Sequence, residues 1–84
     1  MTRLVYFAWV REKVGVMEEE FAIPETVATV GDLITTLAAR DETYAAAFCE
    51  PTMIRTAIDK IHAEHDAPVA GADEIAFFPP MTGG

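Results

Sequence analysis

The stretch Thr29-Val30-Gly31-Asp32-Leu33-Ile34-Thr35-Thr36-Leu37-Ala38-Ala39-Arg40 decides how the rest of the chain can fold. Its apolar residues recur with the period of an α-helix; they are Val30, Leu33, Ile34, Leu37 and Ala38. A helix from about Val30 to Arg40 therefore carries one apolar stripe, which we expect to face a sheet. Thr29 and Asp32 have the spacing of a capping box, with Asp where Glu or Gln is usual, and they mark the start of the helix.

The chain before this helix begins with an apolar segment. Arg3–Val10 is rich in β-branched and aromatic residues and is short enough to be a buried, central strand. We expect a turn at Val14-Gly15, where the chain would reverse into a second strand. Arg11 and Glu12 are expected to stabilise this hairpin rather than to touch a substrate.

The second strand is predicted at Met17–Ile23. Its residues alternate, which places Phe21 and Ile23 on the side of the core, and Pro24 closes the strand. The acidic run Glu18-Glu19-Glu20 lies within it. This run is either a solubilising face or a docking surface for basic partners, and the sequence does not favour one over the other.

The segment after the helix predicts smaller elements. Tyr44–Phe48 is expected to add a short helical turn, which Pro51 ends. Arg55–Ile61 is the predicted third strand, and His62–Asp66 is the polar turn expected after it.

The last strand is predicted at Glu74–Phe78. Side chains alternate between the two faces of a strand, so Phe77 is expected in the core and Phe78 on an exposed face. We interpret Phe78 as the hydrophobic anchor for a partner protein.

The chain then continues as Pro79-Pro80-Met81-Thr82-Gly83-Gly84. Proline has no N–H to give a neighbouring strand, so pairing should end there and residues 79–84 should form a flexible, extended tail. Glycine has no side chain, so Gly83 and Gly84 could enter a narrow channel and present the terminal carboxylate as the reactive group. A flexible end without a function is the alternative.

Composition restricts the function further. The 84 residues, of which 51% are hydrophobic, fit one domain over residues 1–84. A net charge of −8 argues against nucleic acid and anionic membrane and favours basic protein partners. Cys49 is the only cysteine, which excludes an internal disulfide and suits the cytoplasm. No apolar run approaches the roughly 20 residues of a membrane span.

Few side chains suit catalysis. His62 and His65 lack a third strong ligand, so no metal is assigned. Cys49 is expected to pack as a small hydrophobe. The sequence contains neither a glycine-rich phosphate loop nor a nucleophile elbow. The chain is therefore not expected to be an enzyme by itself or to bind a cofactor, and catalytic groups should belong to its partners.

The predicted elements describe an α+β protein with a mixed sheet, one main helix packed across it and an extended tail. This is the β-grasp, or ubiquitin-like, fold, although the order of elements also permits other small α+β topologies. Three stretches resemble the small subunits of molybdopterin synthases, which are ubiquitin-like sulfur carriers. They are Phe7-Ala8-x-x-Arg11-Glu12, Gly71-x-Asp73-Glu74-Ile75-Ala76 and Phe77-Phe78-Pro79-Pro80-x-Thr82-Gly83-Gly84. The resemblance spans the chain and is most specific at its end; one departure is Asp59-Lys60, where the family often has Asn.

The resemblance implies a role in molybdenum cofactor biosynthesis. An adenylyltransferase related to ubiquitin-activating enzymes would use ATP to adenylate Gly84, and a sulfur-donating enzyme would convert it into a thiocarboxylate. The large synthase subunit, in a heterotetramer, would then use this sulfur to form the dithiolene of molybdopterin. The residues implied in partner binding are Phe78, Pro79, Pro80, Met81, Thr82 and Gly83.

Two other classes of function stay open. The chain could carry sulfur for another pathway, such as thiazole synthesis or tRNA thiolation, or be a ubiquitin-like protein modifier. It could also be a β-grasp interaction module that carries nothing.

Overall fold

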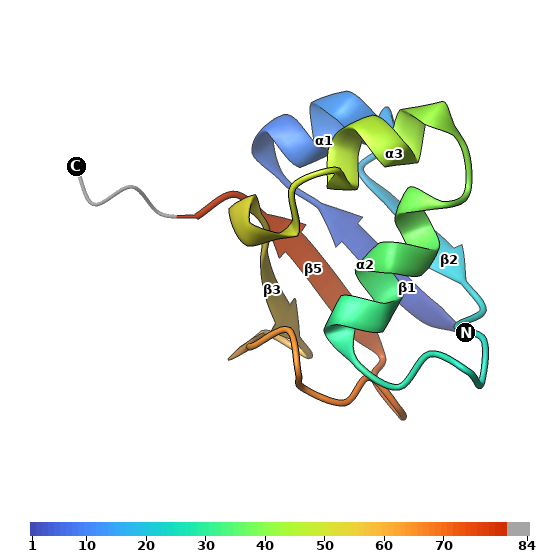
Figure 1. Ribbon diagram of the computed structural model, residues 1–84. Helices are drawn as coiled ribbons and strands as arrows, with labels where there is room; N and C mark the ends of the chain where they lie inside the picture. Colours follow the sequence, from blue (N-terminus) through green and yellow to red (C-terminus); the bar gives the residue numbers. More distant parts are fainter. Residues whose placement is uncertain (81–84) are drawn as a thin grey trace.

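The computed structural model describes residues 1–80, and its centre is a five-stranded sheet in the order β2-β1-β5-β3-β4. Figure 1 shows the helices gathered on one side of this sheet. The elements in chain order are β1 (Thr2–Tyr6), α1 (Ala8–Val14), β2 (Glu18–Phe21), α2 (Val30–Ala38), α3 (Glu42–Phe48), the 3-10 turn η1 (Pro51–Met53), β3 (Arg55–Ile58), β4 (Ile61–Ala63) and β5 (Glu74–Phe78).

The first and last strands lie side by side. β1 and β5 are parallel, with Leu4 opposite Ile75 and Tyr6 opposite Phe77. β2 runs antiparallel to β1, and β3 runs antiparallel to both β5 and the other edge strand, β4. A mixed sheet of this order with α2 packed across it is the β-grasp arrangement, so the predicted fold class is confirmed.

Helix α2 follows the expected pattern. The Thr29 hydroxyl accepts a hydrogen bond from the Asp32 backbone N–H at 3.2 Å, and the Asp32 carboxylate accepts one from the Thr29 N–H at 3.2 Å. This reciprocal pair is a capping box, and it starts the helix at Val30. Four buried residues form the predicted stripe, namely Val30, Leu33, Ile34 and Leu37. The helix ends at Ala38, two residues before the predicted end.

The predicted strand Arg3–Val10 is wrong in its second half. β1 ends at Tyr6, and Ala8–Val14 forms helix α1. Val10 and Val14 are both buried, and their spacing of four residues also suits one face of a helix. A short apolar run fits either structure until its partners are known, and here the chain leaves the sheet after Tyr6 and continues as a helix.

The expected hairpin turn at Val14-Gly15 is the end of this helix. Gly15 has a φ of +94°, the left-handed conformation typical of a helix C-cap, and its N–H donates to the Arg11 carbonyl at 2.8 Å. Arg11 and Glu12 lie exposed on α1. Their predicted role in a hairpin is therefore wrong.

The predicted third strand is also too long. β3 ends at Ile58, and the chain reverses at Asp59 and Lys60, whose φ angles are +49° and +72°. Two central residues with positive φ are typical of a tight hairpin turn. β4 then follows at Ile61–Ala63, where the polar turn was predicted to begin.

Asp59 stabilises this reversal. Its Oδ1 accepts hydrogen bonds from the backbone N–H groups of Asp73 and Glu74 at 3.0 and 2.9 Å. The turn is thereby tied to the start of β5. Asparagine carries an equivalent oxygen, so this contact is the same for either residue.

The remaining helix is longer than predicted. Helix α3 starts at Glu42 rather than Tyr44, because the Asp41 carboxylate caps it by accepting from the Tyr44 N–H at 3.0 Å. Over residues 1–80, none of the helices combines the length and the apolar character needed to cross a membrane.

Candidate functional site

The tail starts from the interior of the sheet. β5 lies between β1 and β3 and ends at Phe78, directly before Pro79. The Phe7 N–H donates to the Phe77 carbonyl at 3.0 Å beyond the end of β1. Figure 1 shows that β5 ends on the side of the sheet away from the N-terminus. The predicted site residues Met81, Thr82, Gly83 and Gly84 lie outside the described residues.

The root of the tail is held by an aromatic cluster. Phe77 is fully buried, as predicted, and its ring stacks on that of Tyr6 with 5.9 Å between centroids. The ring of Phe48 meets Phe77 edge-on at 5.2 Å. These three rings join β5 to β1 and α3. Pairs of this geometry stabilise a core beyond the effect of burial alone.

Phe78 lies on the other face of the sheet, beside the start of the tail. It is half-buried rather than exposed, because β5 has a neighbouring strand on each side. Continuing the parallel register of β1 and β5 places Phe7 next to it, and Phe7 is 49% exposed. The site prediction did not include Phe7, although the alternation of Arg3, Val5 and Phe7 could have placed it on this face.

The acidic run on β2 divides between the two faces. Glu19 lies opposite the buried Leu4, on the side of the helices. Its carboxylate accepts hydrogen bonds from the hydroxyls of Tyr6 and Tyr44, both at 2.6 Å. It also forms an ion pair with Arg40 at 3.1 Å. Glu19 is therefore a structural residue, and it belongs neither to a solubilising face nor to a docking surface for basic partners. Both readings stay open for Glu18 and Glu20.

This network changes how its members titrate. Partial burial by itself would raise the pKa of Glu19, but hydrogen bonds from Tyr44, Tyr6 and Arg40 outweigh it, so the pKa lies below its usual value. Burial and the bond to Glu19 raise the pKa of Tyr44 to about 12. The same two causes raise the pKa of Tyr6. Glu19 is thus held ionised, and the two phenols are held protonated.

Arg40 completes the network from the end of α2. Its guanidinium carbon lies 4.1 Å from the centre of the Tyr44 ring and 5.1 Å from that of Phe21. Phe21 and Ile23 are only partly buried, because β2 is an edge strand; they pack against the core instead of lying inside it.

The cysteine and the two histidines of the chain lie in environments that do not form a reactive or metal-binding site within residues 1–80. Cys49 is exposed at the end of α3, so its predicted packing as a small hydrophobe is wrong. A ring nitrogen of His65 lies 2.9 Å from the Ile54 carbonyl, which makes this histidine a structural link, whereas His62 is exposed on β4. Up to Pro80, His, Cys, Asp and Glu side chains form no group of three that could hold a metal ion.

The described part of the chain lacks the arrangement of a nucleophile and its base. Within residues 1–80, hydroxyl and thiol groups of Thr and Cys donate only to backbone carbonyls, for example Thr2 to Ala72 and Cys49 to Ala46. The phenols of Tyr6 and Tyr44 donate to Glu19, where they are held protonated.

Known proteins resemble this chain in sequence and in fold. The model of the ThiS family matches residues 4–84. The chain is 37% identical to the molybdopterin synthase sulfur carrier subunit of Escherichia coli over 84 residues, with both chains fully covered. A Pyrococcus furiosus structure described as molybdopterin converting factor, subunit 1, is 30% identical, with 94% of this chain and 95% of that one covered and a TM-score of 0.73. SAMP1 of Haloferax volcanii, a small archaeal modifier protein, is 24% identical, with 99% and 98% covered and a TM-score of 0.73, a likeness of fold alone.

Proposed function

Because the chain belongs to the ThiS family, we propose that it is a sulfur carrier of molybdenum cofactor biosynthesis, whose reactive group is the carboxylate of Gly84. One observation supports this most strongly. The strand that leads to the tail is the central strand of the sheet, paired on both sides, and it ends directly before Pro79. The E. coli relative, which is named a sulfur carrier subunit, is matched over its full length.

The chemistry requires activation by a partner. A free carboxylate is a poor acyl donor because oxide is a poor leaving group. In the proposed reaction, an adenylyltransferase transfers AMP from ATP to the Gly84 carboxylate and releases pyrophosphate. A sulfur-donating enzyme then supplies sulfur at the oxidation level of sulfide, which attacks the carbonyl carbon; the bond to AMP breaks, AMP leaves, and a thiocarboxylate remains. Glycine suits this sequence because three different groups must approach one carbon without a Cβ in the way.

The acceptor of the sulfur is proposed to be the large subunit of a molybdopterin synthase. That subunit would supply the catalytic side chains and build the dithiolene from two sulfur deliveries. We propose that Phe78, Pro79 and Pro80 contact it, together with Phe7 at the same end of the sheet. Met81, Thr82 and Gly83 would continue this contact along the channel that leads to the reactive carbon. The requirement for ATP fits a cytoplasmic location.

The direct test is the mass of the intact chain. After incubation with ATP, the adenylyltransferase and a sulfur source, one oxygen should be replaced by one sulfur. A matched variant with one extra residue after Gly84 should keep its mass, since its terminal carboxylate is displaced from the reactive position. An unchanged mass of the native chain with enzymes that act on another carrier would refute the proposal.

Co-purification separates the proposal from its alternatives. A stable complex with a synthase large subunit supports the molybdopterin role. Isopeptide linkage of Gly84 to lysines would instead indicate a modifier, the class named for SAMP1. Full function after removal of Gly84 would indicate an interaction module that carries nothing.

A further inference from the structure

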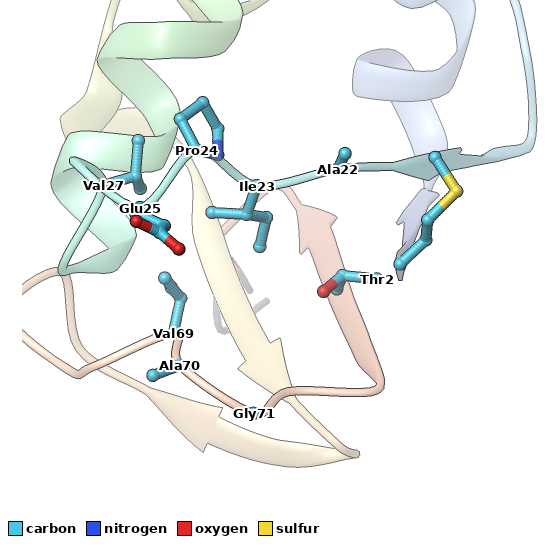
Figure 2. A pocket seen from close by; sticks show the side chains of 10 residues that line it. Thr2, Ala22, Ile23, Pro24, Glu25, Val27, Val69, Ala70 and Gly71 are labelled. Atoms are coloured by element: carbon cyan, nitrogen blue, oxygen red, sulfur yellow. The ribbon is translucent and has the colours of Figure 1, made fainter.

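A hollow lies at the end of the sheet opposite the tail. It has a volume of about 510 Å³ and is formed where the segment between β2 and α2 meets the loop before β5 (Figure 2). Its apolar walls include Ile23, Val27, Val69 and Ala70. Pockets of this volume and largely apolar lining are typical of binding sites.

The walls of the hollow are preformed. Val69 is 2% exposed, and Ile23 and Val27 pack against the hydrophobic core. The Val69 N–H donates to the Ala28 carbonyl at 3.1 Å, and the Val27 N–H donates to the Pro24 carbonyl at 2.9 Å. Both loops are therefore tied in place, so a ligand would not have to order them first.

Glu25 is the one carboxylate among the lining residues. Figure 2 shows it turned toward the space between Val27 and Val69. Within residues 1–80 its carboxylate forms neither a hydrogen bond nor an ion pair, not even with the α-amino group of Met1, a residue that also lines the hollow. An unpaired carboxylate at an apolar hollow, on a chain of net charge −8, favours a cationic ligand.

We propose that this hollow is a second docking site, which takes a Lys or Arg side chain from a basic segment of a partner protein. The aliphatic stem of such a side chain covers apolar surface while its head group stays at the water boundary. Here the stem would lie on Val27 and Val69, and the head group would pair with Glu25.

The site is independent of the tail. β1 and β5 are parallel, so Thr2 and Gly71 lie at their starts, whereas Phe78 lies at the other end. The length of β5 from Glu74 to Phe78, about 13 Å, separates the loop that contains Gly71 from Phe78. A partner bound at the hollow would therefore leave the tail free to enter another protein, which goes beyond the proposed sulfur chemistry.

The test is a titration of the full chain, labelled with ¹⁵N, with the peptide acetyl-Leu-Lys-Leu-Arg-Leu-amide. The amide shifts are expected to concentrate in residues 22–27 and 69–71. Glu25→Gln should weaken binding about three- to five-fold, the effect of removing one exposed charge pair, and added salt should weaken binding to the native chain. A control peptide has Gln in place of Lys and Arg. Its affinity for the native chain should be no higher than the affinity of the basic peptide for Glu25→Gln, since the charge pair is missing in both cases.

The matched control is Glu50→Gln. Glu50 is also exposed and lines another apolar hollow, beside Trp9 and Cys49, so its replacement makes the same change in net charge. Equal weakening by both variants, or shifts spread over the acidic surface, would overturn the proposal. So would a concentration-dependent dimer whose interface covers residues 69–71, since the hollow would then belong to a second copy of this chain. Thiocarboxylate formation by Glu25→Gln should equal that of the native chain, which keeps this test separate from that of the carrier function.

Discussion

Phe77 and Phe78 are neighbours in the chain, yet they lie on opposite faces of the sheet in different environments. Phe77 is fully enclosed by the rings of Tyr6 and Phe48 under the helices. Phe78 is half-buried on the face without helices, at the end of the sheet where Phe7 is 49% exposed. One face of the strand thus holds the tail to the body, and the other is free to meet a partner. The same division separates Glu19 from Glu18 and Glu20 on β2.

The largest expected effect comes from removing the buried ring. Phe77→Ala should lower the free energy of unfolding by about 3–5 kcal/mol, because it leaves a cavity at the meeting point of β1, β5 and α3. Urea denaturation measures this loss. Phe78→Ala is the matched control, and a similar loss in both variants would contradict the difference between the faces.

The network around Glu19 gives the next largest effect. Glu19→Gln should cost about 1–3 kcal/mol, because hydrogen bonds to an ionised acceptor are lost and donors from Tyr6, Tyr44 and Arg40 are left with a poorer partner. Glu20→Gln, on the open face, should change stability by less than about 0.5 kcal/mol. Equal effects of the two substitutions would show that the run acts as a uniform charged surface.

Acid should reduce the difference between the native chain and Glu19→Gln. The folded pKa of Glu19 is lowered, so its stabilisation is complete above the unfolded pKa of about 4.3 and is lost as the pH falls through the folded pKa. Urea midpoints measured from pH 7 to pH 3 should therefore converge below about pH 4. A constant difference over that range would mean that the carboxylate charge is not the source of the stabilisation.

The Asp59 turn should give a smaller effect. Asp59→Ala removes the acceptor of two N–H groups at the start of β5 and places a less suitable residue at positive φ, so a loss of about 1–2 kcal/mol is expected. Asp59→Asn keeps the oxygen and should stay close to the native value in thermal unfolding. A loss with Asn as large as that with Ala would indicate that charge, rather than the oxygen, stabilises the turn.

The smallest effect on stability, and the clearest on partner binding, is expected for Phe78. Phe78→Ala should cost less than about 1.5 kcal/mol in unfolding but should weaken the complex with a large synthase subunit by about 2 kcal/mol or more, as removal of a hot-spot aromatic does. Calorimetric titration measures the second quantity. Unchanged affinity would remove Phe78 from the proposed contact surface.

Much of this fold could be predicted from local sequence. The capping box at Thr29, the helical stripe that follows it and the strand that ends before Pro79 all depend on residues close together in the chain. The errors at Arg3–Val10 and Arg55–Ile61 have one cause. Both are short apolar runs, and their periodicity does not show where a strand stops and its continuation turns away.

The candidate site was predictable in its chemistry and less so in its surroundings. Two prolines and two terminal glycines are local signals, and the resemblance to a sulfur carrier family depended on them. Placing Phe7 at the same end of the sheet as Phe78 required the parallel register of β1 and β5, which joins residues about seventy positions apart. The bonds of Glu19 to Tyr44 and Arg40 likewise join elements that the sequence keeps apart.

The sequence by itself determined the main helix, the last strand, the abrupt end of pairing at Pro79 and the identity of the terminal residues, because capping, periodicity and the missing proline N–H act within a few residues. Tertiary structure alone decided that β5 lies in the centre of the sheet, that Glu19 is enclosed while Glu18 and Glu20 are not, and that a hollow with one unpaired carboxylate forms at the far end. Each of these depends on which distant segments pack together, and that choice is made by the burial of the whole core rather than by any one stretch of the chain.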